Sequence, residues 1–143
     1  MGLHEVLADV VVAGADGWGR HDHGAGAKVI VEFVSANPTG PLHAGHGRGA
    51  CYGDSVARLY ERCGYQVARE FYINDRGIQM QNFAASLAAR AGGREVADDG
   101  YHGQYIVDWA AEMPIDADPL EWGYARALAA HQSVLESLSI HFD

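Results

Sequence analysis

The sequence contains few cysteines and few basic residues. Only Cys51 and Cys63 occur among 143 residues, which argues against a disulfide framework and favours a reducing cytoplasm. Ten lysines and arginines stand against 19 aspartates and glutamates, for a formal net charge of −9. Because binding along a nucleic-acid backbone draws on lysine and arginine, this composition argues against extensive nucleic-acid contact by this segment.

Long apolar runs and a basic N-terminal stretch are also absent. No part of the chain reaches the roughly 18 consecutive apolar residues that a membrane-spanning helix needs. The first residues, MGLHE, do not have the pattern of a secretory signal. The hydrophobic share of 48% is typical of a globular domain. We therefore expect a globular chain that has no membrane partner.

The first 27 residues differ from the rest. Apolar side chains recur at helical spacing over residues 3–12, and a loop with five glycines follows over residues 14–27. We predict a linker helix and a glycine-rich loop over residues 1–27, ahead of a main domain over residues 28–143.

The main domain alternates between strand and helix patterns. Runs of β-branched and aromatic residues predict strands, and the segments between them have helical periodicity with glycine or proline at their ends. The predicted order is strand 29–34, helix 43–62, strand 65–73, helix 78–90, helix 101–113 and helix 120–138. This order predicts an α/β fold with a parallel sheet, right-handed crossovers and flanking helices. Two strands are fewer than a doubly wound sheet normally has, so we expect an incomplete domain whose free sheet edge favours self-association.

The most informative segment joins the first predicted strand to the helix after it, and it reads EFVSANPTGPLHAGHGRG from Glu32 to Gly49. His43 and His46 are three positions apart, so they share one face at the start of the helix. A helix N-terminus offers free backbone N–H groups and a positive dipole end, which suit a phosphate. Gly45 has no side chain, so a flat ligand such as a nucleoside could approach the backbone there.

Two further glycines, Gly47 and Gly49, follow in the same predicted helix. Each weakens a helix by up to about 1 kcal/mol relative to alanine. Either close approach by a ligand or tight packing of the helix on the sheet would explain them.

From these residues alone, several other interpretations stay open. The two histidines could simply cap or pack the helix, and Asn37 could satisfy the backbone of a turn. Glu32 could face water at the end of its strand. A zinc site built from His43, His46 and Cys51, or from His21 and His23, lacks an orderly set of four ligands. We therefore predict no metal site.

The motif HAGH at residues 43–46 resembles the HIGH signature of class I aminoacyl-tRNA synthetases. The preceding VEFVSANPTGPL resembles the version found in bacterial arginyl-tRNA synthetases. Further matching segments are GD at 53–54, YINDRGIQ at 72–79 and DGYHG at 99–103. The resemblance extends over nearly the whole chain. It implies the first part of a Rossmann-like (HUP-type) catalytic domain of an arginine–tRNA ligase, which activates arginine with ATP and transfers it to tRNA(Arg).

The resemblance also implies roles for individual residues. The two histidines would be catalytic, because they would contact the phosphates of ATP and stabilise charge as pyrophosphate leaves. The expected ATP-binding residues are Pro38, His43, Gly45 and His46, and the expected arginine-binding residues are Glu32, Ser35 and Asn37. ATP would enter with Mg²⁺, and no tightly bound cofactor is expected. Contacts with tRNA(Arg) would lie mainly outside this chain.

The chain also departs from the family pattern, because it has no KMSKS-like segment and no anticodon-binding domain. The alternative function is that of a truncated, stand-alone paralogue. Such a protein would bind ATP, an adenylate or a partner protein without charging tRNA.

Overall fold

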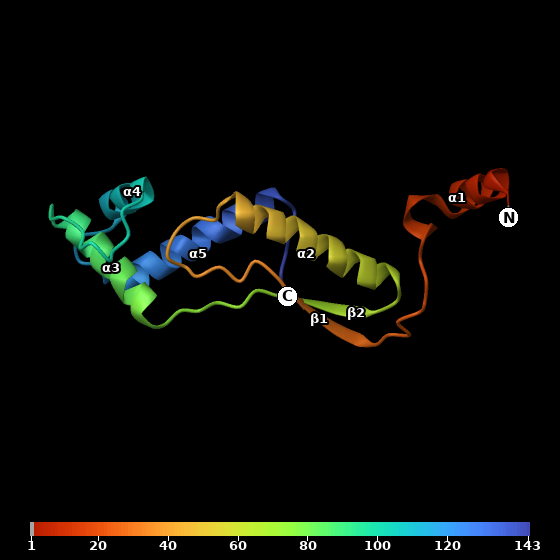
Figure 1. The fold of residues 1–143 in the computed structure, drawn as a ribbon, viewed down its shortest axis with the longest axis horizontal. Coiled ribbons are helices and arrows are strands. Elements are labelled where there is room, and N and C mark those ends of the chain that lie inside the picture. The colour runs from red at the N-terminus through yellow and green to blue at the C-terminus, as the bar shows by residue number, and fades with distance from the viewer. Residues whose placement is uncertain (1) are drawn as a thin grey trace.

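The structure, a computed structural model, describes residues 2–143 and confirms the predicted elements. They follow in the order α1 (Leu3–Gly17), β1 (Lys28–Glu32), α2 (Ala44–Arg62), β2 (Gln66–Glu70), α3 (Ile78–Ala91), α4 (Gln104–Glu112) and α5 (Pro119–Ser137). The predicted bounds differ from the observed ones by a few residues. Figure 1 shows an elongated molecule, with the sheet and α2 between α1 at one end and the group of α3 and α4 at the other.

The two strands form a parallel pair, as the alternating pattern predicts. The register runs from Lys28 opposite Gln66 to Glu32 opposite Glu70. Along both strands, exposed side chains alternate with half-buried ones. Helix α2 packs along the sheet and covers one face, as the ribbon shows (Figure 1). The opposite face is open, and Ile30 on β1 is 66% exposed.

The buried residues form two separate clusters. The first lies among α3, α4 and α5 and contains Met80, Phe83, Leu87, Ile106, Trp109, Ala110 and Ala127. The second lies between the end of β1, helix α2 and the end of α5, and contains Phe33, Ala50, Leu135 and Ile140. Helix α5 contributes Ala127 to the first cluster and Leu135 to the second, so this one helix joins the two hydrophobic cores.

Two adjacent residues of α2, Gly53 and Asp54, fix this helix on the sheet. Gly53 is buried against the ring of Phe33, and an added Cβ there would clash with Cγ of Phe33. The carboxylate of Asp54 accepts hydrogen bonds from Nε of Arg58 at 2.6 Å and from Nε of Arg69, on β2, at 3.4 Å. The GD segment at 53–54 thus has a packing role in this structure.

Helix termini carry the residues that their positions require. At the start of α5, Oδ1 of Asp118 accepts hydrogen bonds from the backbone N–H groups of Leu120 and Glu121, both at 2.9 Å. Helix α2 ends at Arg62 with Cys63 as its C-cap, and Gly64 follows with a φ of 84°, in the left-handed region that glycine adopts without strain. The predicted stop of this helix at Gly64 is confirmed.

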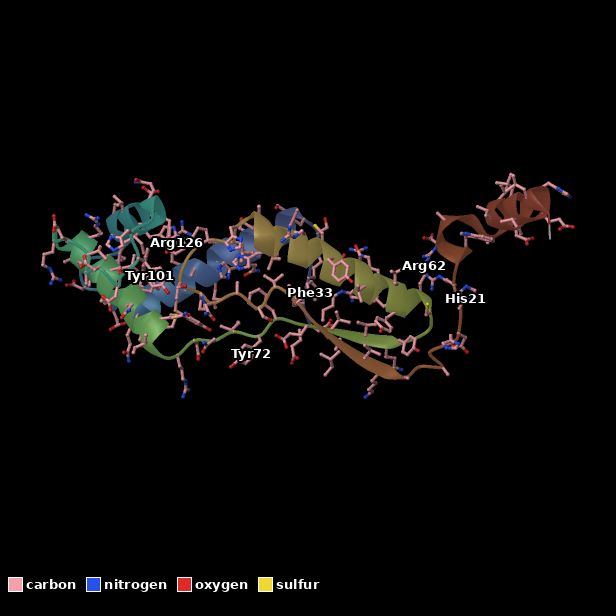
Figure 2. The ribbon with its side chains drawn as sticks, in the orientation of Figure 1. His21, Phe33, Arg62, Tyr72, Tyr101 and Arg126 are labelled. Atoms are coloured by element: carbon pink, nitrogen blue, oxygen red, sulfur yellow. The ribbon has the colours of Figure 1, made fainter. Side chains whose placement is uncertain are left out.

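Helix α1 lies apart from both clusters. It continues past the predicted end to Gly17, with a break at Gly14, and none of its residues is buried. Arg62 of α2 holds the end of this helix, because its Nη2 donates to the carbonyl oxygens of Ala15 and Trp18 at 2.6 Å each. Figure 2 shows Arg62 at this junction. The division of the chain at residues 27 and 28 stays a prediction.

No helix within residues 2–143 combines the length and the apolar character needed to cross a membrane.

Candidate active site at the start of helix α2

The chain leaves β1 through two residues in left-handed backbone. Val34 has a φ of 66° and Ser35 a φ of 41°, conformations that cost of order 1–3 kcal/mol each outside glycine. The hydroxyl of Ser35 donates a hydrogen bond to Oε1 of Glu32 at 2.7 Å and accepts one from the backbone N–H of Tyr72 at 3.1 Å. Figure 2 shows Phe33 and Tyr72 just beyond the carboxyl ends of the two strands.

This turn brings together two of the residues expected to bind arginine. Ser35 orients the carboxylate of Glu32, and Glu32 itself is exposed. The exposure agrees with a strand-end position that faces water, and it also leaves the carboxylate accessible to a cation. At this point the structure provides an anionic group that is held in place by a neighbouring hydroxyl.

The next part of the loop contains Asn37 and Pro38. Nδ2 of Asn37 donates to Oε1 of Gln79, in the first turn of α3, at 2.6 Å. This bond ties the exposed loop to the helical half of the molecule. Pro38 is fully buried, so its side chain supports the loop. The contact between Pro38 and ATP stays a prediction.

The two histidines cap helix α2 reciprocally. Nδ1 of His43 accepts hydrogen bonds from the backbone N–H groups of Gly45 at 3.1 Å and His46 at 3.4 Å. In return, Nδ1 of His46 accepts from the backbone N–H of His43 at 3.2 Å. The two imidazole rings stack, with centroids 3.8 Å apart and planes inclined by 17°. The interpretation as helix-capping histidines is thus confirmed, and the capping fixes both rings.

Capping determines which ring nitrogen is available to a ligand. A neutral imidazole carries one proton, so a ring whose Nδ1 accepts a hydrogen bond carries that proton on Nε2. Both His43 and His46 accept at Nδ1, which makes Nε2–H the donor of each ring. Two of the backbone N–H groups that we expected to be free at this helix terminus are occupied by His43. An anion would therefore meet two imidazole donors as well as the helix dipole.

The three glycines of the motif have different surroundings. A side chain at Gly45 would lie 2.9 Å from Cε1 of His43, so the absence of a side chain allows this ring to fold over the start of the helix. At Gly47 and Gly49, an added Cβ would meet no atom within 4 Å. Tight packing on the sheet therefore does not explain Gly47 and Gly49, and the space beside them is open to a ligand.

Two histidines, the half-buried His46 and the buried His131, make stability depend on pH. The pKa of His46 is lowered, mainly by burial and then by the charges of His43 and His131. Burial also lowers the pKa of His131, although its bond to the Gly40 carbonyl opposes this shift. The unfolded chain therefore binds protons more readily than the folded chain does below the ordinary histidine pKa of 6.5.

We accordingly expect the free energy of unfolding to be fully retained above pH 6.5 and to fall as the pH drops below that value. Urea denaturation on both sides of this pH measures the effect. His23→Gln, at an exposed histidine, is the control and should leave the pH dependence unchanged. Glu61, whose pKa is lowered mainly by a hydrogen bond from Arg69, adds a further loss only below about pH 4.5. A flat profile between pH 7 and pH 5 would contradict the prediction.

The structure adds two residues that the sequence did not indicate. Tyr105 on α4 and His131 on α5 contact the carbonyl oxygens of Thr39 and Gly40, in the loop that precedes His43. A tyrosine and a histidine within apolar helical patterns are also common in cores, so the sequence alone gives no reason to connect them with a loop far away in the chain.

Metal-ligating side chains do not gather elsewhere in the described part of the chain. Within residues 2–143, no three histidine, cysteine, aspartate or glutamate side chains are arranged to hold a metal ion. Cys51 and Cys63 are both free, with Cys51 exposed and Cys63 half-buried.

Comparison with known proteins bears on this site. The family model described as "tRNA synthetases class I (R), catalytic domain" matches residues 9–101. The chain is 48% identical over 120 aligned residues to an arginine–tRNA ligase of Shouchella clausii, which covers 80% of this chain and 21% of that protein. It is 42% identical to an arginine–tRNA ligase of Desulforudis audaxviator, over 99% of this chain and 28% of that protein. The chain thus spans about a quarter of the length of these relatives.

A solved structure gives the same result for the fold. A crystal structure described as that of an arginyl-tRNA synthetase from Campylobacter jejuni superposes with a TM-score of 0.78 at 30% identity. The superposition covers 99% of this chain and 35% of the other. The strand–loop–helix unit that carries His43 and His46 lies inside the matched residues. The chain belongs to the class I aminoacyl-tRNA synthetases, in the arginyl family whose catalytic domains share a Rossmann-like fold.

Proposed function

We propose that this chain supplies the ATP-phosphate site and part of the arginine site of an arginine–tRNA ligase. The carboxylate of arginine attacks the α-phosphorus of ATP, pyrophosphate leaves, and arginyl-adenylate forms. A hydroxyl group at the 3′ end of tRNA(Arg) then attacks the arginyl carbonyl, the arginyl group passes to the tRNA, and AMP leaves. The observation that carries this proposal is the reciprocal capping of His43 and His46, which occupies both Nδ1 atoms and leaves two Nε2–H donors at a helix N-terminus.

The histidines would act by hydrogen bonding and electrostatics. Negative charge develops on the departing pyrophosphate, and fixed donors at that position stabilise the transition state. The lowered pKa of His46 keeps its imidazole neutral near pH 7, so it serves as a hydrogen-bond donor without a full charge. ATP is the substrate as its magnesium complex, in which phosphate oxygens provide metal ligands.

The arginine end of the site would use the turn after β1. The exposed carboxylate of Glu32, held by Ser35, is a suitable partner for a planar guanidinium, which can form two parallel hydrogen bonds to it. Asn37 would accept from the α-amino group of the substrate. Its contact with Gln79 uses one N–H of the amide, which leaves the amide oxygen for this purpose.

Contacts with tRNA would come mainly from other parts of the protein, because the net charge of this chain is −9. Its two free cysteines are consistent with the reducing cytoplasm that we propose as its compartment.

Calorimetric titration with a non-hydrolysable arginyl-adenylate analogue tests the proposal. We expect binding that prefers the arginyl analogue to the lysyl analogue. The double variant His43→Ala/His46→Ala should bind about tenfold more weakly or worse, since it loses two donors. Glu32→Gln is the matched variant for the other end of the site. It keeps the shape of the side chain and should abolish the preference for arginine over lysine.

The outcomes separate this proposal from its alternative. A folded chain that binds neither analogue would refute the proposed site. A chain that binds the arginyl analogue but forms no arginyl-tRNA when ATP, arginine and tRNA(Arg) are supplied would favour the stand-alone adenylate-binding protein.

A further inference from the structure

Two side chains from the helical half of the molecule hold the loop that leads to His43. The hydroxyl of Tyr105 donates to the carbonyl oxygen of Thr39 at 2.9 Å. Nε2 of His131 lies 2.7 Å from the carbonyl oxygen of Gly40. These carbonyls belong to consecutive residues, so α4 and α5 hold two adjacent peptide groups of one loop. The contacts join residues that are 66 and 91 positions apart in the chain.

The loop also approaches Tyr105 closely at Gly40. A Cβ at this position would lie 2.9 Å from Cζ of the Tyr105 ring and 3.0 Å from its hydroxyl oxygen. Only glycine permits this approach without displacing the ring. The Tyr105 ring is also held by Trp109, against which it packs edge-on with ring centroids 5.2 Å apart.

Both side chains remain hydrogen-bond donors near neutral pH. Burial raises the pKa of Tyr105 to about 12, so its hydroxyl keeps its proton. Burial lowers the pKa of His131, so its ring is neutral, and the contact with a carbonyl assigns the single proton to Nε2. Nδ1 of His131 is buried and has no hydrogen-bond partner within residues 2–143. A buried nitrogen without a hydrogen-bond partner destabilises the fold, and an apolar residue at position 131 would avoid this loss. The bond with Gly40 therefore explains why a histidine stands here.

Little freedom remains between this contact and the histidine motif. Only Pro41 and Leu42 separate Gly40 from His43. Pro41 has a fixed φ, and Leu42 packs against the second hydrophobic cluster. The positions of the Thr39 and Gly40 carbonyls therefore determine the direction in which the chain enters α2, and with it the placement of the His43 ring.

We propose that Tyr105 and His131 are positioning residues for the HAGH motif, acting through the carbonyl oxygens of Thr39 and Gly40. Their effect on ligand binding rests on the proposed function, whereas their effect on the geometry of the histidine pair does not. Helices α4 and α5 then shape the active site through the loop that leads to His43.

The spectroscopic test uses Tyr105→Phe in the full chain, with Tyr101→Phe as the control. Both changes remove one hydroxyl from a ring beside the first cluster, but Tyr101 makes no side-chain hydrogen bond to the loop among the described residues. We expect Tyr105→Phe to shift the imidazole NMR signals of His43 and His46. Amide hydrogen exchange at Gly45 and His46 should accelerate by about threefold to tenfold, the equivalent of one hydrogen bond. Tyr101→Phe should change neither.

The second test compares two substitutions of His131. His131→Leu removes the donor, and His131→Gln retains an N–H group at a similar distance from the backbone. We expect the affinity for the arginyl-adenylate analogue to fall about threefold to tenfold in His131→Leu. His131→Gln should recover most of this loss. A role in packing alone would not predict this recovery, because leucine fills the buried site at least as well as glutamine.

Unchanged His43 and His46 signals in a folded Tyr105→Phe variant would overturn the positioning proposal. Equal affinity in His131→Leu and in the unmodified chain would do the same. If the unmodified chain does not bind the analogue, the proposed function fails, and the imidazole signals of the tyrosine variants still decide whether these residues position the motif.

Discussion

Phe83→Ala should lower the free energy of unfolding by about 3–5 kcal/mol, the usual cost of removing a buried phenylalanine. Phe83 is completely buried at the centre of the first cluster. Its ring contacts those of Tyr101 and Trp109, with centroids 5.9 Å and 6.1 Å away. No neighbouring residue can fill the space without disturbing the contacts among α3, α4 and α5.

Urea denaturation followed by tryptophan fluorescence measures this loss, because Trp109 and Trp122 both lie at the first cluster. Ile78→Ala, in the same helix, is the control. Ile78 is 73% exposed, so its removal should change the unfolding free energy by no more than about 0.5 kcal/mol. Equal unfolding midpoints for the two variants would show that the helical group is not packed as described.

Gly53→Ala should also destabilise the chain strongly. An added Cβ would lie 2.5 Å from Cβ of Phe33 and closer still to its ring, so α2 or the end of β1 must move. Overpacking of this kind costs about 1–3 kcal/mol. The better helix propensity of alanine, up to about 1 kcal/mol, offsets only part of this cost.

Gly49→Ala is the matched control, since it makes the same substitution in the same helix. An added Cβ there meets nothing within 4 Å, so we expect a gain of up to about 1 kcal/mol. Because both variants gain the same helix propensity, they should differ in unfolding free energy by the overpacking cost alone, about 1–3 kcal/mol, as measured by thermal or urea denaturation. Equal stability of the two variants would contradict the close contact between α2 and Phe33. If Gly49→Ala is stable but binds the adenylate analogue poorly, the open space beside this glycine is part of the ligand site.

The elements of the fold could be predicted from sequence because their signals are local. Helix α2 combines a capping residue at its start with Gly64 at its end, and β1 is a compact run of β-branched residues. The parallel pairing followed from the alternation of strand and helix. The end of β1 was harder to predict from the sequence. Val34 continues the β-branched pattern, yet its φ of 66° takes it out of the strand, because Ser35 must turn to reach both Glu32 and Tyr72.

The site was predicted in part. Spacing alone identified His43 and His46 as neighbours on one face, and the structure confirms this with stacked rings. Spacing could not reveal that their Nδ1 atoms cap the helix, since that depends on side-chain rotation. Nor could it show that Pro38 is buried. The sequence could not predict the contacts of Tyr105 and His131, because these contacts depend on how the two halves of the chain pack together.

The bond between His131 and Gly40 has a consequence for the time course of synthesis. The two residues are 91 positions apart, and ribosomes add roughly 5–20 residues per second. Gly40 therefore emerges roughly 5–20 s before the side chain that holds its carbonyl oxygen. Helix α2, β2, α3 and α4 are all synthesised during that interval, but the entry into α2 cannot take its final geometry until α5 has been made. The histidine motif is therefore synthesised well before α5 and takes its final position only after α5 has been made.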